Sequence, residues 1–241
     1  MTSLHFFGTG GGFEPAYGNS AALVRHGGET LLLDCGFTVY PELVRRGLTG
    51  AFSGILLTHL HCDHCGSLAM TLQHRLHLKT GPPPTIWFAN DAQRDDLLRL
   101  LTVQTKDPFK YADFRPLAEL PDVCVLDTFG RHSAGYQSFS YAFDDPTDHS
   151  RLAYSGDLAE PDFLFSWLDS LPPIGRIRVL HDLNFERSSG GHTFYADLLP
   201  YRARYPELFG YHCDPTRNPP DNPIPLAYNT PELMLPAHPV S

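Results

Sequence analysis

The chain of 241 residues is 42% hydrophobic and 19% charged, which is enough to bury the core of a single domain. Its formal net charge of −9 argues against long nucleic acid as a partner, because polyanion binding depends on clustered Lys and Arg; a local basic patch remains an open alternative. No run reaches the roughly 18 apolar residues of a membrane span and residues 1–5 do not resemble a secretory signal, so we expect a cytoplasmic protein with no membrane partner.

In the first half of the chain, short apolar runs bounded by glycine or proline alternate with longer periodic stretches. Strands are predicted at residues 4–7, 21–25, 30–33, 54–58 and 85–89, with Gly27-Gly28 as the turn of a hairpin. Helices are predicted at residues 67–78 and 91–103. The run Gly81-Pro82-Pro83-Pro84 must end the first helix, and Asn90 or Asp91 caps the start of the second.

The second half of the chain repeats this order of elements. Strands are predicted at residues 123–126, 136–143, 152–154 and 177–181, and helices at residues 161–168 and 194–205. Both halves thus supply strands first and helices after. This order predicts an α/β protein in which two sheets face each other with helices outside, a four-layer αββα sandwich.

The composition changes at Asp214, after which eight prolines occur in 28 residues. Such a segment is expected to be extended rather than helical. We therefore predict one domain at residues 1–213 and a Pro-rich tail at residues 214–241 that packs on the domain or extends from it. Two alternatives stay open: a disordered or surface-lying tail, and a segment that crosses onto a partner subunit.

The most specific pattern is His59-Leu60-His61-Cys62-Asp63-His64, which directly follows the apolar run 55–57. Imidazole and carboxylate are ligands of zinc and similar divalent ions. His59 and His61 are spaced to converge on one ion, while Asp63 and His64 reach a second. Cys62 and Cys65 form a CxxC, but a structural zinc site needs a second such pair, so we interpret both as packing residues.

Further candidate ligands follow other predicted strands. His132 precedes a strand, Asp157 comes after one and follows Gly156, which lets the backbone turn sharply, and His212 follows the apolar run 208–211. Taken one at a time, each of these residues is better explained as an ordinary surface or core residue than as a ligand. Their weight comes from the order in which they occur.

Eight segments share this order with one known group of proteins. They are Phe7-Gly8-Thr9-Gly10-Gly11, Leu33-Asp34-Cys35-Gly36, residues 57–64, His132 before Gly135-Tyr136, Ser155-Gly156-Asp157, residues 180–185, Gly191-His192-Thr193 and Tyr211-His212. In this order they resemble the metallo-β-lactamase superfamily, and within it the ribonuclease Z-like phosphodiesterase branch. The resemblance covers almost the whole chain up to His212 and implies the αββα fold of that superfamily.

The resemblance also implies a role for each candidate. One metal ion would be bound by His59, His61 and His132, and a second by Asp63, His64 and His212, with Asp157 bridging the two ions. Asp34 resembles the family's acid that holds the ligand loop by hydrogen bonds without touching metal. The expected ions are zinc, with manganese or iron as alternatives.

The chemistry implied is hydrolysis of a phosphodiester. Two ions about 3.5 to 4 Å apart share a hydroxide that attacks phosphorus, and His192, oriented by Asp182, resembles the general acid that protonates the leaving oxygen. Arg187 is a candidate for contact with the substrate phosphate. For His192 and Arg187 the ordinary interpretation, an exposed loop residue, stays open.

The chain departs from the ribonuclease Z pattern at two places. His181-Asp182-Leu183-Asn184 stands where a His-Glu-Ala-Thr-like sequence is usual, which places a shorter acid beside His192. The proline run after Gly81 leads straight into a strand and leaves no room for the protruding arm that grips tRNA. Small substrates are therefore favoured over RNA.

We accordingly predict a dinuclear metal-dependent phosphodiesterase that acts on a small or cyclic nucleotide-like substrate, and a homodimer by analogy with the superfamily. Three alternatives are retained: a lactonase or thioesterase of the same superfamily, an RNA 3′-end endonuclease like ribonuclease Z, and a non-catalytic metal-binding protein. A carbonyl substrate has less need of the acid pair His192 and Asp182, which argues against the first of these.

Overall fold

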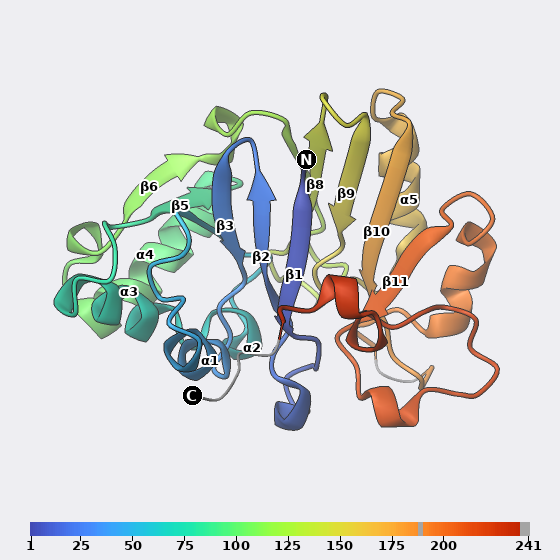
Figure 1. Ribbon diagram of the computed structural model, residues 1–241, viewed down its shortest axis with the longest axis horizontal. Coiled ribbons are helices and arrows are strands. Elements are labelled where there is room, and N and C mark those ends of the chain that lie inside the picture. Colours follow the sequence, from blue (N-terminus) through green and yellow to red (C-terminus); the bar gives the residue numbers. More distant parts are fainter. Residues whose placement is uncertain (188–189, 237–241) are drawn as a thin grey trace.

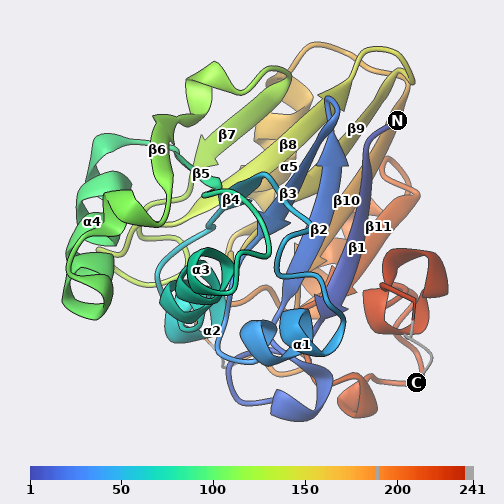
Figure 2. The ribbon, with the colours of Figure 1, turned by 60° about the vertical axis from the view of Figure 1, so that its left-hand side comes forward.

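Two β-sheets lie face to face, with helices on their outer faces, in the computed structural model, which describes residues 1–187 and 190–236 (Figure 1). The predicted α/β class and four-layer αββα arrangement are confirmed. In Figure 2 the first sheet lies in front of the second, with α1 and α3 on its near side.

The first sheet has six strands in the order β1-β2-β3-β4-β5-β6. These strands are β1 (Ser3–Gly8), β2 (Ala21–His26), β3 (Glu29–Leu33), β4 (Gly54–Leu56), β5 (Thr85–Phe88) and β6 (Asp113–Pro116). Strands β1 to β3 are antiparallel, and β3 to β6 pair in parallel. The hairpin at Gly27-Gly28 is thus confirmed.

The second sheet has five strands in the order β11-β10-β9-β8-β7. They are β7 (Val123–Asp127), β8 (Phe139–Asp145), β9 (Ser150–Tyr154), β10 (Arg176–Asp182) and β11 (Glu207–Tyr211). Strands β9, β10 and β11 are parallel, so their carboxyl ends lie at one edge of the sheet.

The helices cover the outer faces of both sheets. They are α1 (Val39–Arg45), α2 (Cys62–Cys65), α3 (Leu68–His77), α4 (Asp91–Thr105) and α5 (Pro161–Ser170). The side chain of Asn90 accepts a bond from the amide of Gln93 and so caps α4. Within residues 1–187 and 190–236, none of the helices is both long and apolar enough to cross a membrane.

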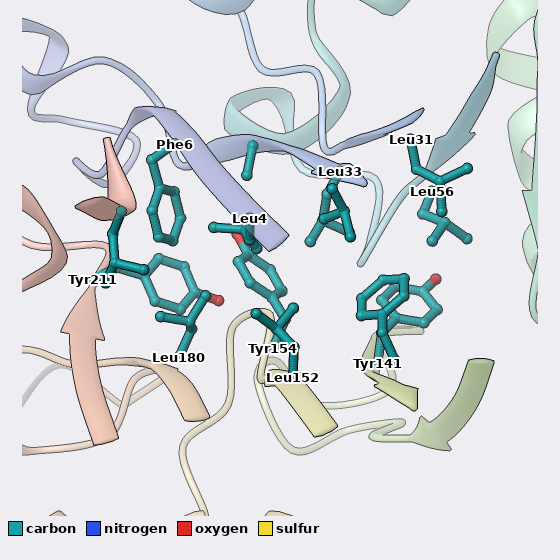
Figure 3. Packing of buried hydrophobic residues seen from close by; sticks show 14 of the residues in the cluster. Leu4, Phe6, Leu31, Leu33, Leu56, Tyr141, Leu152, Tyr154, Leu180 and Tyr211 are labelled. Carbon is teal, nitrogen blue, oxygen red and sulfur yellow. The ribbon is translucent and has the colours of Figure 1, made fainter. Parts of the chain in front are cut away.

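Successive side chains of a strand point to opposite faces of the sheet, so the apolar side chains are divided between the core between the sheets and the layer under the outer helices. In β3, Leu31 and Leu33 point into the core between the sheets, whereas Leu32 points to the helices outside. Figure 3 shows Leu4, Phe6, Leu31, Leu33 and Leu56 of the first sheet facing Tyr141, Leu152, Tyr154, Leu180 and Tyr211 of the second. A third group of apolar side chains fills the space between the second sheet, α5 and the last turns.

Several predicted elements differ from the observed ones. The helix predicted at residues 194–205 is a short 3₁₀ helix, η4 (Tyr195–Tyr201), because Pro200 lies inside it and cannot donate a backbone hydrogen bond. The strand predicted from residue 136 begins only at Phe139, since residues 128–138 form the turn that carries His132. The helix α1 and the exposed edge strand β6 were not predicted.

The segment that follows Asp214 packs on both sheets as far as the described residues extend, to residue 236. It contains short 3₁₀ turns at η5 (Pro215–Arg217), η6 (Ala227–Asn229) and η7 (Pro231–Leu233), separated by extended stretches. Its apolar side chains are buried, with Ile224 and Leu226 against the outer face of the second sheet and Leu233 in the core between the sheets. Residues 237–241, the end of the predicted tail, lie outside the described residues.

Replacing Leu233 by alanine tests this packing. Leu233 is completely buried between the sheets, so the substitution is expected to lower the free energy of unfolding by about 2 to 5 kcal/mol. Leu78→Ala is the matched control, because Leu78 is 64% exposed and its loss should cost no more than about 0.5 kcal/mol. Urea denaturation followed by circular dichroism measures both; equal effects of the two substitutions would contradict the packing.

Candidate metal centre

The candidate ligands lie at the carboxyl ends of strands from both sheets. Parallel strands end at the same edge of a sheet, which is where α/β proteins commonly hold ligands. The residues at these ends are Asp34 after β3, His59 after β4, Asp157 after β9, Asp182 as the last residue of β10 and His212 after β11, while His132 lies in the loop between β7 and β8. Residues scattered along the chain thereby converge.

A first cluster consists of His59, His61 and His132. The Nε2 atoms of His59 and His132 each lie 3.0 Å from Nδ1 of His61. The ring of Tyr136 stacks on that of His61 with centroids 4.4 Å apart, and Nδ1 of His132 donates to the carbonyl of Gly191 over 2.8 Å. Three imidazole nitrogens converge here, and two of the rings are fixed by the contacts with Tyr136 and Gly191. Such a set of nitrogens is typical of the ligands of divalent ions.

A second cluster consists of Asp63, His64, Asp157 and His212. Nε2 of His64 lies 3.2 Å from Nε2 of His212, 3.4 Å from Oδ2 of Asp63 and 3.3 Å from Oδ1 of Asp157. Nε2 of His212 lies 3.3 Å from Asp63 and 3.4 Å from Asp157. Donor atoms around a tetrahedral ion at about 2.0 to 2.1 Å are themselves about 3.3 to 3.4 Å apart, so the spacing matches one ion.

Asp157 faces both clusters with different oxygens. Its Oδ1 points to the second cluster, where it accepts no hydrogen bond from the described residues despite complete burial. Its Oδ2 lies 3.8 Å from Nε2 of His59 and 3.7 Å from Nε2 of His132. A buried carboxylate oxygen without a hydrogen-bond donor is costly unless a cation neutralises it. This observation fits a metal ion on each side of Asp157.

The turn at Gly156 fixes this carboxylate. Gly156 has φ of 61°, and a β-carbon there would lie 2.8 Å from the carbonyl oxygen of Phe139 and 3.0 Å from Thr58 Cβ. Only glycine adopts this turn without strain or collision. The sharp turn expected from the sequence is thus present.

Asp34 holds the ligand loop from behind. Its Oδ1 accepts the backbone amide of Thr58 at 2.7 Å, and its Oδ2 lies 2.9 Å from Nδ1 of His64. With Nδ1 of His64 engaged in this way, Nε2 is directed to the second cluster. Asp34 belongs to neither of these two donor clusters.

The two clusters differ in their electrostatics. Burial, followed by the charge of His64, holds the pKa of His59 well below its usual range, which favours the neutral imidazole that binds metal. Burial also opposes charge on His64, but Asp157 and Asp34 outweigh it and raise the pKa of His64 well above its usual value. The carboxylates of Asp157 and Asp34 thus favour positive charge at this position.

A third feature is the pair His192 and Asp182. Nδ1 of His192 lies 2.9 Å from Oδ2 of Asp182, while Oδ1 of Asp182 lies 3.1 Å from Nδ1 of His181. Burial lowers the pKa of His192, but the bond to Asp182 and the charge of Asp157 outweigh it and raise that pKa to about 9. The aspartate that replaces the usual glutamate therefore reaches His192. The histidine is also close enough to His132 and Asp157 to share an ion with them.

A cavity of about 580 Å³ opens in front of both clusters. Its walls include ligand residues and His192, together with Phe13, Glu14, Phe185, Glu186 and Arg217, to which the sequence analysis assigned no role. The sequence signals near these residues were the glycine run directly before Phe13 and the matching segment 180–185, which ends at Phe185.

The structure places Arg187 away from this cavity. Its guanidinium lies 3.1 Å from Oδ1 of Asp197 and 4.5 Å from the centre of the Phe194 ring, and it does not line the cavity. The arginine that does line it is Arg217, which forms an ion pair with Glu186.

The fold is shared with solved metallo-β-lactamase proteins. YhfI of Bacillus subtilis, a metallo-β-lactamase fold protein, superposes with a TM-score of 0.67 at 18% identity, over 88% of this chain and 87% of YhfI. The short form of human tRNase Z superposes with a TM-score of 0.64 at 19% identity, over 88% of this chain and 92% of that enzyme. The resemblance to the superfamily and its ribonuclease Z-like branch is confirmed for the fold.

Sequence comparison identifies the family. The Anti-Pycsar protein Apyc1 of Bacillus phage vB_BsuM-Goe3 is 42% identical over 225 residues, which cover 86% of this chain and 85% of the phage protein. The family model of Anti-Pycsar protein Apyc1 matches residues 2–220. The chain therefore belongs to the Anti-Pycsar protein Apyc1 family.

Proposed function

We propose that this protein is a dinuclear metal-dependent phosphodiesterase that hydrolyses a cyclic nucleotide. Apyc1 proteins degrade cyclic nucleotides, and the chain is a metal-dependent hydrolase of that family. The observation that carries the proposal is the position of the Asp157 carboxylate. One of its oxygens faces each donor cluster, and the pair of His192 and Asp182 lies beside it.

The residues that would hold the ions follow from the two clusters. His59, His61 and His132 would bind one ion, Asp63, His64 and His212 the other, and Asp157 both. Imidazole with carboxylate suits zinc, and manganese or iron as alternatives. When bound, such a pair of ions supplies positive charge that stabilises the phosphate oxygens and lowers the pKa of the attacking water.

His192 supplies the proton that the leaving group requires. As water attacks phosphorus, the bond from phosphorus to one ribose oxygen breaks, and Nε2 of His192 donates its proton to that oxygen. Asp182 holds Nδ1 of His192 at 2.9 Å and so directs Nε2 away from itself and stabilises the charged imidazole. The product is a linear nucleoside monophosphate.

The cavity favours a small substrate over RNA. A volume of about 580 Å³ lies within the range of small-molecule pockets, and the net charge of −9 disfavours a long polyanion. The link between α3 and β5 spans only residues 78–84, which provides no arm for gripping tRNA.

Two further expectations remain predictions. The homodimer rests on the superfamily resemblance alone, and analytical ultracentrifugation of the purified chain tests it. The cytoplasmic location also remains a prediction, and cell fractionation tests it.

A substrate panel tests the reaction class. Protein prepared with zinc or manganese should hydrolyse cyclic nucleotides with a kcat/KM far above that for lactones, thioesters or precursor tRNA. The carbonyl substrates have less need of the His192 proton, and the cavity of about 580 Å³ favours a small substrate over RNA. His59→Ala should abolish this turnover, whereas His77→Ala, an exposed residue of α3, should not. Preference for a carbonyl substrate, or no turnover with any divalent ion, would contradict the proposal.

The leaving group tests the role of His192. His192→Ala should lower kcat for a cyclic nucleotide by about 10² to 10⁴-fold, but much less for bis(p-nitrophenyl) phosphate, whose nitrophenolate departs without a proton. Steady-state kinetics measures both, and elemental analysis should find the metal content unchanged. Equal losses on the two substrates, or loss of metal, would show that His192 is a ligand or a structural residue instead.

A further inference from the structure

Phe13 is an aromatic side chain without a packing partner at the edge of the active-site cavity. It is 97% exposed, more than any other large apolar side chain among residues 1–187 and 190–236, yet it lines the cavity. Single exposed apolar residues are common on protein surfaces. This one differs in its position, because it belongs to the loop that passes over the ligands.

The backbone before Phe13 lies close to residues of the candidate metal centre. A β-carbon on Gly11 would lie 3.1 Å from Cε1 of His212, and one on Gly12 would lie 3.2 Å from Oδ2 of Asp63. The side-chain amide of Asn19 donates to the carbonyl of Gly11 at 3.3 Å. The loop therefore passes close to two candidate ligand side chains and is held by a hydrogen bond two residues before Phe13.

A second aromatic residue of the cavity, Phe185, is fixed on the side of His192. It follows Asn184, whose amide donates to the carbonyl of Thr193 at 2.9 Å and whose side chain donates to that of His192 at 3.3 Å. Phe185 also packs near Tyr195, with ring centroids 6.1 Å apart. The cavity thus has one aromatic wall that is packed and one, Phe13, that is uncovered.

We propose that Phe13 stacks on the nucleobase of the substrate and forms a base subsite of the cavity; this inference rests on the proposed function. With the phosphate at the ligand clusters, the base is the planar, uncharged part of a nucleotide that remains to be bound. Glu14, Glu186 and Asp214, which also line the cavity, disfavour a further phosphate there. Because every base has an aromatic face, stacking tolerates purines and pyrimidines alike.

Two substrates that differ only in the base test this subsite. For adenosine 3′,5′-cyclic monophosphate, Phe13→Ala should lower kcat/KM about tenfold, mainly by raising KM, because stacking is equal in the ground and transition states. For methyl riboside 3′,5′-cyclic phosphate, which has no base, the change should stay within about twofold. Phe13→Trp should retain wild-type kinetics on both.

Phe109→Ala is the matched control, since Phe109 is 65% exposed and does not line the cavity; it should leave both substrates unaffected. Equal losses of Phe13→Ala on the two substrates would mean that the loop has shifted the ligands and would overturn the subsite, as would no loss on the nucleotide. Wild-type protein that hydrolyses neither substrate would instead overturn the proposed function, and the inference with it.

Discussion

The carboxylate of Asp157 is the feature on which the rest of the centre depends. It is buried between two groups of imidazoles, with one oxygen 3.3 Å from His64 and the other 3.7 Å from His132. Charged groups are buried in proteins only when neighbours or ions compensate them. Burial by itself would raise the pKa of Asp157, but the charges of His212 and His64 hold it well below its usual range. The carboxylate therefore stays ionised, which is the form that binds a cation.

The sandwich provides this arrangement because its two sheets end together. Asp34 and His59 come from the first sheet, and Asp157 and His212 from the second, so neither sheet alone contains a complete cluster. Asp34 and His212 also have φ of 61° and 65°, a conformation that is unfavourable for residues other than glycine. Such strain is tolerated where the surrounding structure fixes a functional side chain. The apolar core between the sheets thus stabilises a strained and charged edge.

Much of this centre could be predicted from the sequence, because one part of it is a local motif and the rest resembles a known superfamily. The spacing of His59, His61 and His64 shows ligand chemistry directly, and the order of the later motifs relates His132, Asp157 and His212 to it. The layers followed from alternating apolar residues and from the order of strands and helices. The histidine motif and the layers depend on neighbours in the chain, which a sequence displays, whereas the roles of His132, Asp157 and His212 came from the resemblance to the superfamily.

What the sequence did not predict depends on contacts between distant segments. Arg187 was a candidate for phosphate contact, but Asp197 lies within 3.1 Å of it and pairs with it. Phe13 and Arg217 line the cavity only because the loop that contains Gly11 and Gly12 and the turn η5 both lie beside the two donor clusters. The strand β6 escaped prediction because its side chains are largely exposed, so that it lacks the apolar alternation of a half-buried strand.

The metal content of the protein tests the central claim most directly. If Asp157 faces two ions, inductively coupled plasma mass spectrometry of chelator-free protein should find two divalent ions per chain. The same protein with Asp157→Ala should hold fewer than two, because both clusters lose an oxygen ligand. A wild-type content of one ion or none, or a full content in the variant, would contradict the account.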